Sequence, residues 1–167
     1  MTTTGIGLTV TRAAYTDPDA QRLIAATLAD LAERYGGEGD ATPVDAADFV
    51  PPNGVFLLAW LDGVAVGCGA WRGHGEDAEI KRMYTAAEVR GRGVARALLT
   101  ELENAARAAG KRRMILETGL KQPEAIGLYE SRGYLPIPNF GYHKDEPDAV
   151  SYGLELYAFN PLPDLAG

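Results

Sequence analysis

The sequence is poor in the residues that build covalent or metal-bound frameworks. Its 167 residues include a single cysteine, Cys68, and only two histidines, His74 and His143. One cysteine excludes an intramolecular disulfide and is compatible with a reducing compartment. The three residues lie far apart in the sequence and do not have the spacing of a metal site. We therefore expect no metal, and we interpret Cys68, which lies inside an apolar run, as a small core residue.

Long apolar runs and an excess of positive charge are also missing. No window approaches the roughly 18 consecutive apolar residues of a membrane helix, and the N-terminus lacks the basic and apolar regions of a signal peptide. Acidic residues outnumber basic ones by 23 to 16, giving a net charge of −7. This charge argues against nucleic acid or an anionic membrane as the main partner. The expected location is cytoplasmic.

The length and composition are those of one globular domain. Apolar residues make up 46% of the chain and charged residues 23%, and 167 residues are enough to bury a sizeable core. We expect residues 1–167 to form a single domain with a loosely packed tail at 160–167.

Apolar periodicity predicts alternating strands and helices along most of the chain. A strand, a helix and a strand at 78–85, 94–109 and 113–118 predict a βαβ crossover with parallel strands. Asp62-Gly63 joins two apolar runs and favours a type I′ hairpin. The fold class is α/β with a mixed sheet. Other strands are expected at 6–13, 55–61, 64–71, 134–137 and 150–159, and other helices at 17–35, 43–49 and 123–132.

The turn Arg90-Gly91-Arg92-Gly93 opens the helix at 94–109 against two ordinary rules. No Ser, Thr, Asp or Asn is present to cap the first N–H groups. Three arginines, including Arg96, gather where the helix dipole disfavours each cation by roughly 0.3–1 kcal/mol. A bound anion such as a phosphate would explain both features. The alternative is a basic loop followed by a surface helix.

Other phosphate-binding motifs fit this turn less well. The chain contains no G-x-x-x-x-G-K-[ST] sequence, which argues against a nucleoside-triphosphate P-loop. A dinucleotide-binding turn requires three glycines near the start of a βαβ unit, and only Gly91 and Gly93 are in place here.

Two motifs resemble those of the GCN5-related N-acetyltransferase (GNAT) superfamily. Arg90-x-x-Gly93-x-Ala95 resembles its [Q/R]-x-x-G-x-[G/A] signature. Downstream, the stretch from Gln122 to Tyr134 resembles its N-x-x-A-x-x-[FL]-Y-x-x-x-G-[FY] element, with Gln122 in place of the usual Asn. The expected element order is also that of the GNAT, or acyl-CoA N-acyltransferase, fold. The resemblance therefore extends over nearly the whole chain and implies a central mixed sheet with helices on both faces.

The resemblance implies direct acetyl transfer from acetyl-CoA to an amine, without a metal. The turn and helix start would hold the coenzyme A pyrophosphate, and the backbone before the turn would pair with the pantetheine arm and polarise the thioester carbonyl. The coenzyme A contacts that it implies are Met83, Tyr84, Thr85, Arg90, Gly91, Arg92, Gly93, Val94, Ala95, Arg96, Gln122 and Tyr129.

The resemblance also implies catalytic residues. Tyr129 matches the family tyrosine near the coenzyme sulfur and is the expected general acid, because a phenol stays protonated at neutral pH. The alternative is an aromatic residue packed on the sheet. Glu79 is the expected base, and Glu76, Asp77 and Glu117 are alternatives. A solvated charge at the strand end is the other interpretation of Glu79.

Acceptor-site residues are expected only from where this fold places acceptors. The acceptor is expected to be a small or amino-acid-like amine. A protein or peptide acetyltransferase and a non-catalytic acyl-CoA-binding regulator stay open, as do a monomer and a homodimer. The residues proposed for the acceptor site are Tyr35, Glu79, Phe140, Tyr142 and His143, with Glu33 and Arg34 as further candidates.

Overall fold

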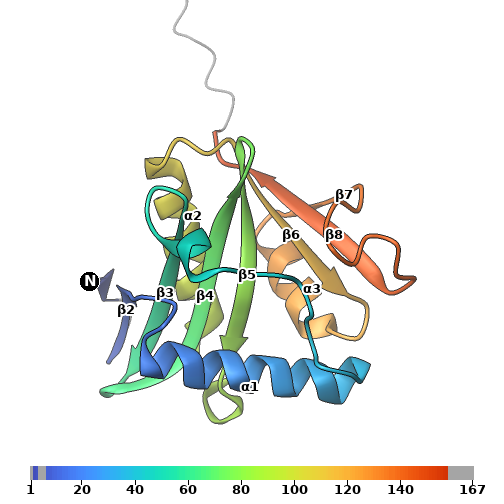
Figure 1. Ribbon diagram of the computed structural model, residues 1–167. Coiled ribbons are helices and arrows are strands. Elements are labelled where there is room, and N and C mark those ends of the chain that lie inside the picture. The colour runs from blue at the N-terminus through green and yellow to red at the C-terminus, as the bar shows by residue number, and fades with distance from the viewer. Residues whose placement is uncertain (1, 4–6, 158–167) are drawn as a thin grey trace, which may run out of the picture.

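A computed structural model describes residues 2–3 and 7–157 of the chain (Figure 1). The strands are β1 (Thr2–Thr3), β2 (Leu8–Arg12), β3 (Gly54–Leu61), β4 (Val64–His74), β5 (Asp77–Thr85), β6 (Arg113–Gly119), β7 (Leu135–Ile137) and β8 (Ala149–Glu155). The helices are α1 (Pro18–Tyr35), α2 (Val94–Ala108) and α3 (Pro123–Ser131), with short 3-10 turns η1 (Ala46–Phe49) and η2 (Ala87–Val89). None of the helices in these residues combines the length and apolar character needed to cross a bilayer.

The described strands form one mixed sheet in the order β1-β2-β3-β4-β5-β6-β8-β7. Only β5 and β6 pair in parallel among them. The connection between these two strands contains α2, so the expected βαβ crossover is confirmed. The antiparallel alternation of strand directions is therefore interrupted between β5 and β6.

Helices cover both faces of the sheet, as Figure 1 shows. One core cluster joins α1 to one face through residues such as Leu23 and Phe56. The larger cluster lies on the opposite face and joins α2 and α3 to the sheet through residues such as Leu98, Leu102 and Tyr129. This arrangement confirms the expected mixed sheet with helices on both sides.

Local sequence signals predicted the positions of most helices, strands and turns correctly. Asp17 caps α1 by accepting hydrogen bonds from the backbone of Asp19 and Ala20. Asp62 and Gly63 have φ values of 50° and 83°, which is the geometry of the predicted type I′ turn. The predicted strands and the helices at 17–35, 94–109 and 123–132 appear within a few residues of their expected limits.

The structure corrects two boundaries. The helix expected at 43–49 is only the 3-10 turn η1, because Asp45 caps the backbone of Ala47 and so starts the turn at Ala46. β4 continues to His74, which shortens the turn expected at 73–77 to two residues. The ends of the strands expected at 6–13 and 150–159, and the tail at 160–167, lie partly or wholly outside the described residues.

Candidate active site

The sheet opens between β5 and β6. These strands pair only from Asp77↔Arg113 to Glu79↔Ile115, whereas β6 continues to pair with β8 up to Gly119. Beyond Glu79 the backbone of β5 therefore lacks a neighbouring strand on its β6 side. A cavity of about 480 Å³ lies in the opening, lined by both strands, by α1 and α3, and by two loops at 36–41 and 139–148.

A β-bulge in β5 directs two successive cations into this cavity. The register of β4 and β5 shifts between Cys68 and Ala70, and Arg82 has a φ of 60°. Successive strand residues normally point to opposite faces. Here Lys81 and Arg82 both reach the carboxylate of Asp40, at 3.2 and 2.6 Å.

Cys68 supports the bulge as a core residue. Its thiol is fully buried and donates to the carbonyl oxygen of Arg82 at 3.2 Å. Burial raises the pKa of Cys68 to about 12. The thiol therefore stays protonated at neutral pH, as expected for a packed side chain rather than a nucleophile.

The predicted anion site lies at the exposed start of α2. Gly93 is the N-cap residue, with a φ of 83°, and no side chain caps the helix. The backbone N–H of Ala97 donates the first hydrogen bond of the helix, to the carbonyl oxygen of Gly93 at 3.0 Å. The N–H groups before it therefore have no partner within the helix. Arg92 and Arg96 are exposed. Donors and positive charge therefore converge on this turn.

Arg90 connects this turn to the end of β5. Its Nε donates to the carbonyl of Thr85 at 3.1 Å, and its guanidinium lies 5.9 Å from the centre of the Tyr84 ring. Met83 and Tyr84 line the cavity, whereas the turn at 90–96 is outside the lining. A ligand that follows the free edge of β5 would thus run from the turn into the cavity.

Tyr129 reaches the cavity from α3. It is buried and packs against Tyr134, with ring centres 5.4 Å apart. Burial raises the pKa of Tyr129 above its usual range, so the phenol stays protonated at neutral pH. Gln122, the N-cap residue of α3, also lines the cavity, and its amide donates to the hydroxyl of Tyr35 at 3.4 Å.

Comparison with known protein families identifies the family of this chain. A model described as the acetyltransferase (GNAT) family matches residues 24–134, more than half of the chain. The chain belongs to the GNAT family. Relatives of this chain are named acetyltransferases, and this chain is accordingly an N-acetyltransferase of that family.

Individual GNAT relatives agree in sequence and in structure. An "IAA acetyltransferase" of Azospirillum brasilense is 34% identical over 134 residues, which cover 79% of this chain and 83% of the relative. A Klebsiella pneumoniae protein assigned to the acyl-CoA N-acyltransferases is 32% identical, with a TM-score of 0.76, and the alignment covers 90% and 98% of the two chains. A GNAT acetyltransferase of Elizabethkingia anophelis, solved with acetyl-CoA bound, shares the fold at 17% identity, with a TM-score of 0.65 over 90% and 99% of the chains.

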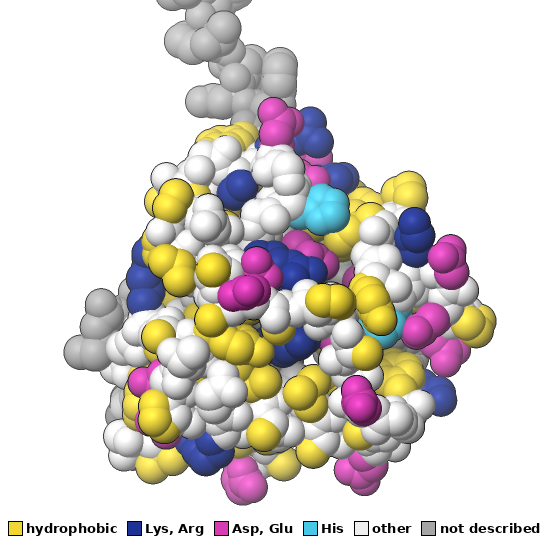
Figure 2. All heavy atoms as spheres, viewed as in Figure 1, with side chains coloured by type: hydrophobic (Ala, Val, Ile, Leu, Met, Phe, Trp, Pro, Cys, Tyr) yellow, Lys and Arg dark blue, Asp and Glu magenta, His cyan; other side chains and the backbone are white. Residues whose placement is uncertain are grey.

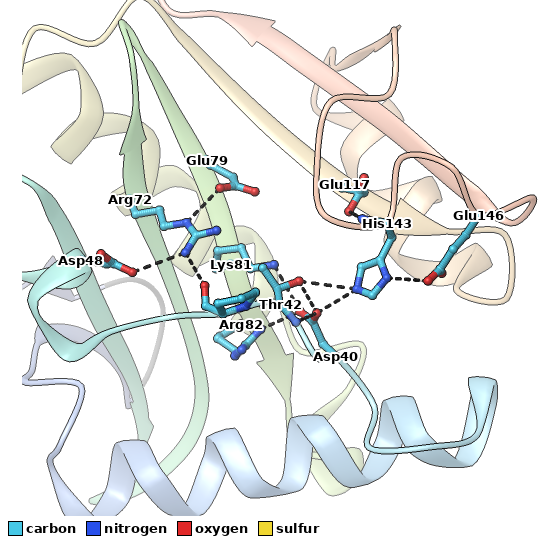
Figure 3. A network of polar contacts seen from close by, with 11 residues as sticks. Asp40, Thr42, Asp48, Arg72, Glu79, Lys81, Arg82, Glu117, His143 and Glu146 are labelled. Carbon is cyan, nitrogen blue, oxygen red and sulfur yellow. Dashed lines mark hydrogen bonds and ion pairs between the residues drawn. The ribbon is translucent and has the colours of Figure 1, made fainter.

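A polar network forms the side of the cavity that faces α1. Asp40, in the loop after α1, accepts hydrogen bonds from Thr42 and from Nε2 of His143 at 3.0 Å, in addition to its pairs with Lys81 and Arg82 (Figure 3). Burial opposes ionisation of Asp40, but Lys81 and these hydrogen bonds lower its pKa far below the usual range. Asp40 is therefore a saturated anion and has no free lone pair for accepting a substrate proton.

His143 connects the two loops over the cavity. Its Nε2 bonds Asp40, and its Nδ1 lies 2.8 Å from Glu146. Burial lowers the pKa of His143, but the two carboxylates outweigh it and the pKa is raised. Because both nitrogens face carboxylates, the doubly protonated ring is favoured, and it has no lone pair with which to act as a base.

Glu117 of β6 is a carboxylate of this cavity that has spare hydrogen-bonding capacity. Its Oε1 accepts the backbone N–H of His143 at 3.0 Å. Its Oε2 is buried and has no hydrogen-bond partner among the described residues. The backbone of Gly141 lies so close that a Cβ there would come within 2.7 Å of the carboxylate. No ion pair of Glu117 is found in the described part of the chain.

Some of the residues predicted for the acceptor site line the cavity, and others lie outside it. Tyr35, Tyr142 and His143 line the cavity. Phe140 is outside the lining and packs against His74, with ring centres 5.5 Å apart. Figure 2 shows acidic and basic side chains gathered near the centre of this face, among apolar and uncharged atoms.

Glu79 lies next to the cavity but outside its lining. It is buried, and its Oε1 accepts from Nε of Arg72 at 2.9 Å. Arg72 also donates to the carbonyl of Pro43 and to Asp48, so this group of contacts ties the η1 segment to the sheet. Of the further candidates, Arg34 pairs with Asp30 and Glu124, and it too lies outside the lining.

The sequence did not indicate Asp40, Lys81 or Arg82 as site residues. Asp40 lies in a glycine-rich loop that looks like a flexible connection, and nothing in the sequence marks the bulge that turns Arg82 toward it. No group of three or more potential metal ligands is found among the described residues.

The His143 contacts predict a pH-dependent stability. The folded-state pKa is raised, so the contribution of His143 is fully present below the unfolded value of about 6.5 and is lost as pH rises through the higher folded value. We expect wild type to exceed His143→Gln in free energy of unfolding at pH 5 and to lose this advantage by pH 9.

Urea titrations from pH 5 to pH 9 measure this difference. Lys144→Gln is the control, because it removes a positive charge from the same loop outside the cavity lining. A difference between wild type and His143→Gln that stays constant with pH would show that the two carboxylate contacts do not favour the protonated ring.

Proposed function

We propose that this GNAT enzyme transfers the acetyl group of acetyl-CoA directly to the amine of a small, amino-acid-like acceptor. The observation that carries the proposal is the opening between β5 and β6, which places the free edge of β5 and Tyr129 in one cavity. The exposed start of α2 lies beyond the end of the same strand. The loops at 36–41 and 139–148 contribute to the lining, which favours a small acceptor over a protein surface.

The residues present fit acetyl-CoA. An uncapped helix start with exposed arginines suits a pyrophosphate, which Arg92, Arg96 and the amides of residues 91–96 would hold. The backbone of Met83, Tyr84 and Thr85, which has no strand on its β6 side, would bind the pantetheine arm as an additional strand. Arg90 would hold the end of β5 against the turn through its bond to Thr85. Acetyl-CoA supplies the activated acetyl group when bound.

Tyr129 and Glu117 are proposed to handle the protons. The transfer forms a bond from the acceptor nitrogen to the acetyl carbon and breaks the carbon–sulfur bond. Tyr129 donates its phenolic proton to the leaving sulfur, and its buried, protonated state suits this role. The acceptor ammonium loses two protons, of which one replaces the Tyr129 proton and one is released to solvent.

Glu117 replaces Glu79 as the proposed base. A base requires a lone pair within reach of the amine. Glu117 has an unpartnered oxygen and lines the cavity, whereas Glu79 is bonded to Arg72 and lies outside the lining. The role of Glu79 is then to hold the η1 segment through Arg72.

An acetylation assay against individual small amines and short peptides tests this function. We expect acetylated product by mass spectrometry and an equal amount of free coenzyme A thiol for at least one small amine, with weaker transfer to peptide lysines and N-termini. Tight coenzyme A binding with no transfer to any amine would favour a binding regulator. Transfer to peptides alone would favour a protein acetyltransferase.

A further inference from the structure

Two residues of opposite charge face each other across the opening in the sheet. The last β5–β6 pair is Glu79↔Ile115. Lys81 and Glu117 each lie two residues beyond it, and residues two apart on a strand share a face. Both side chains line the cavity. No ion pair joins them in the described structure, because Lys81 pairs with Asp40 instead.

On one side of the cavity, the carboxylate of Glu117 has no counter-ion among the described residues. One carboxylate oxygen is buried and has no partner among the described residues, and the other accepts only a neutral backbone N–H. The residue is half-buried, and an unpartnered polar oxygen that is shielded from water favours a ligand group that can donate to it. Gly141 leaves room for the carboxylate but contributes no donor side chain. The missing counter-ion is therefore expected from a ligand.

The opposite wall has two cations that share one carboxylate. The side chains of Lys81 and Arg82 are only 9% and 4% exposed, and both pair with the same Oδ2 of Asp40. An ammonium can donate three hydrogen bonds, and for Lys81 only the contact with Asp40 is found among the described residues. Nε of Arg82 is buried and has no partner there either. This wall can accept a second anion.

We propose that the acceptor is a free amino acid, whose ammonium group binds Glu117 and whose carboxylate binds Lys81 and Arg82. The proposal deepens the function argued above and rests on it. A zwitterion supplies both missing charges at once, and its amine is placed next to the proposed base. An amine without a carboxylate would leave the donors of Lys81 and Arg82 unused.

Matched sets of acceptors test the proposal with the wild-type enzyme. Each set contains an amino acid, its amide, and the amine that lacks the α-carboxyl group. We expect kcat/KM for the best amino acid to exceed that of its amide and its decarboxylated amine by on the order of 100-fold, because a site built for hydrogen bonds rejects analogues that leave its groups unpaired.

Lys81→Met and its control test whether the preference for amino acids over their amides depends on Lys81. Lys81→Met should reduce the ratio between amino acid and amide to below about 10-fold, mainly through KM for the amino acid. Lys144→Met removes an exposed lysine outside the cavity lining and should leave the ratio unchanged. Calorimetry with coenzyme A shows whether Lys81→Met is folded and retains its cofactor site.

Glu117→Gln tests the opposite wall. It keeps the shape of the side chain and removes the charge, so transfer to the best amino acid should fall at least about 100-fold, while the affinity for coenzyme A is retained. Glu155→Gln, at an exposed position on β8, is the matched control.

Three results would overturn the proposal: amides or decarboxylated amines acetylated as well as amino acids, a preference that survives Lys81→Met, or transfer to none of the amino acids. The proposed function is judged separately. It stands if coenzyme A binds and any other small amine is acetylated, and it fails if coenzyme A does not bind or if no small amine is acetylated.

Discussion

Gly93→Glu is expected to abolish coenzyme A binding. Gly93 caps α2 with a φ of 83°, at the point where N–H groups without helical partners converge. A glutamate there would bring a negative charge to the pyrophosphate site and displace the ligand from those donors. Each charge-assisted hydrogen bond contributes about 1.5–3 kcal/mol, so the loss of two should raise Kd by at least about 100-fold.

Gly110→Glu is a matched control at the other end of the same helix. Gly110 has a φ of 77°, and like Gly93 it has open space where a Cβ would lie. Both variants therefore introduce the same side chain at a left-handed position. At the C-terminal end a glutamate also opposes the helix dipole, so Gly110→Glu should be the less stable variant and yet bind coenzyme A normally.

Isothermal titration calorimetry with coenzyme A and thermal unfolding of both variants test whether the start of α2 binds the pyrophosphate. If Gly93→Glu bound coenzyme A with wild-type affinity, the pyrophosphate could not lie at the start of α2. An equal loss of affinity in both variants would mean that the effect comes from backbone strain rather than from the anion site.

Tyr129→Phe is expected to reduce kcat at least about 100-fold, the usual contribution of a positioned general acid. The hydroxyl is the only group that this substitution removes, and the ring can keep its packing against Tyr134. Because the side chain is buried and its pKa is raised, the wild-type hydroxyl keeps its proton at neutral pH and has it available for the departing sulfur. Coenzyme A affinity should change little.

Steady-state kinetics and calorimetry together test this role. Tyr157→Phe, which removes the hydroxyl of an exposed tyrosine bonded to the backbone of Arg107, should turn over like wild type. A Tyr129→Phe enzyme with wild-type kcat would contradict the role of Tyr129 as the acid. A loss that appears only in coenzyme A affinity would assign it to binding.

The proposed cofactor side of the site rests on signals that are local in the sequence. The uncapped arginine-rich turn, the amphipathic helix after it and the Gln122–Tyr134 element are each contiguous stretches, and local rules of capping and periodicity apply to them. The structure places them where a parallel pair of strands separates. The boundaries that were missed, such as the end of β4, depend on pairing between strands.

The acceptor side was decided by the tertiary structure. Asp40, Lys81, Glu117 and His143 come from four separate segments, and only the opening of the sheet brings them around one cavity. Alternation along β5 would place Arg82 on the face opposite Lys81, but one bulge puts both on Asp40. Glu79, the base that the family resemblance suggested, is bonded to Arg72 through one oxygen and lies outside the cavity lining.

The sequence by itself therefore determined the family and the element order, and it predicted an anion site at the start of α2. Each of these follows from residues close together in the chain, whose backbone conformation they set directly. The tertiary structure decided that Glu117 has an unpartnered oxygen and that Lys81 and Arg82 share Asp40. These properties depend on the burial and pairing of side chains from distant segments, and no local pattern encodes them.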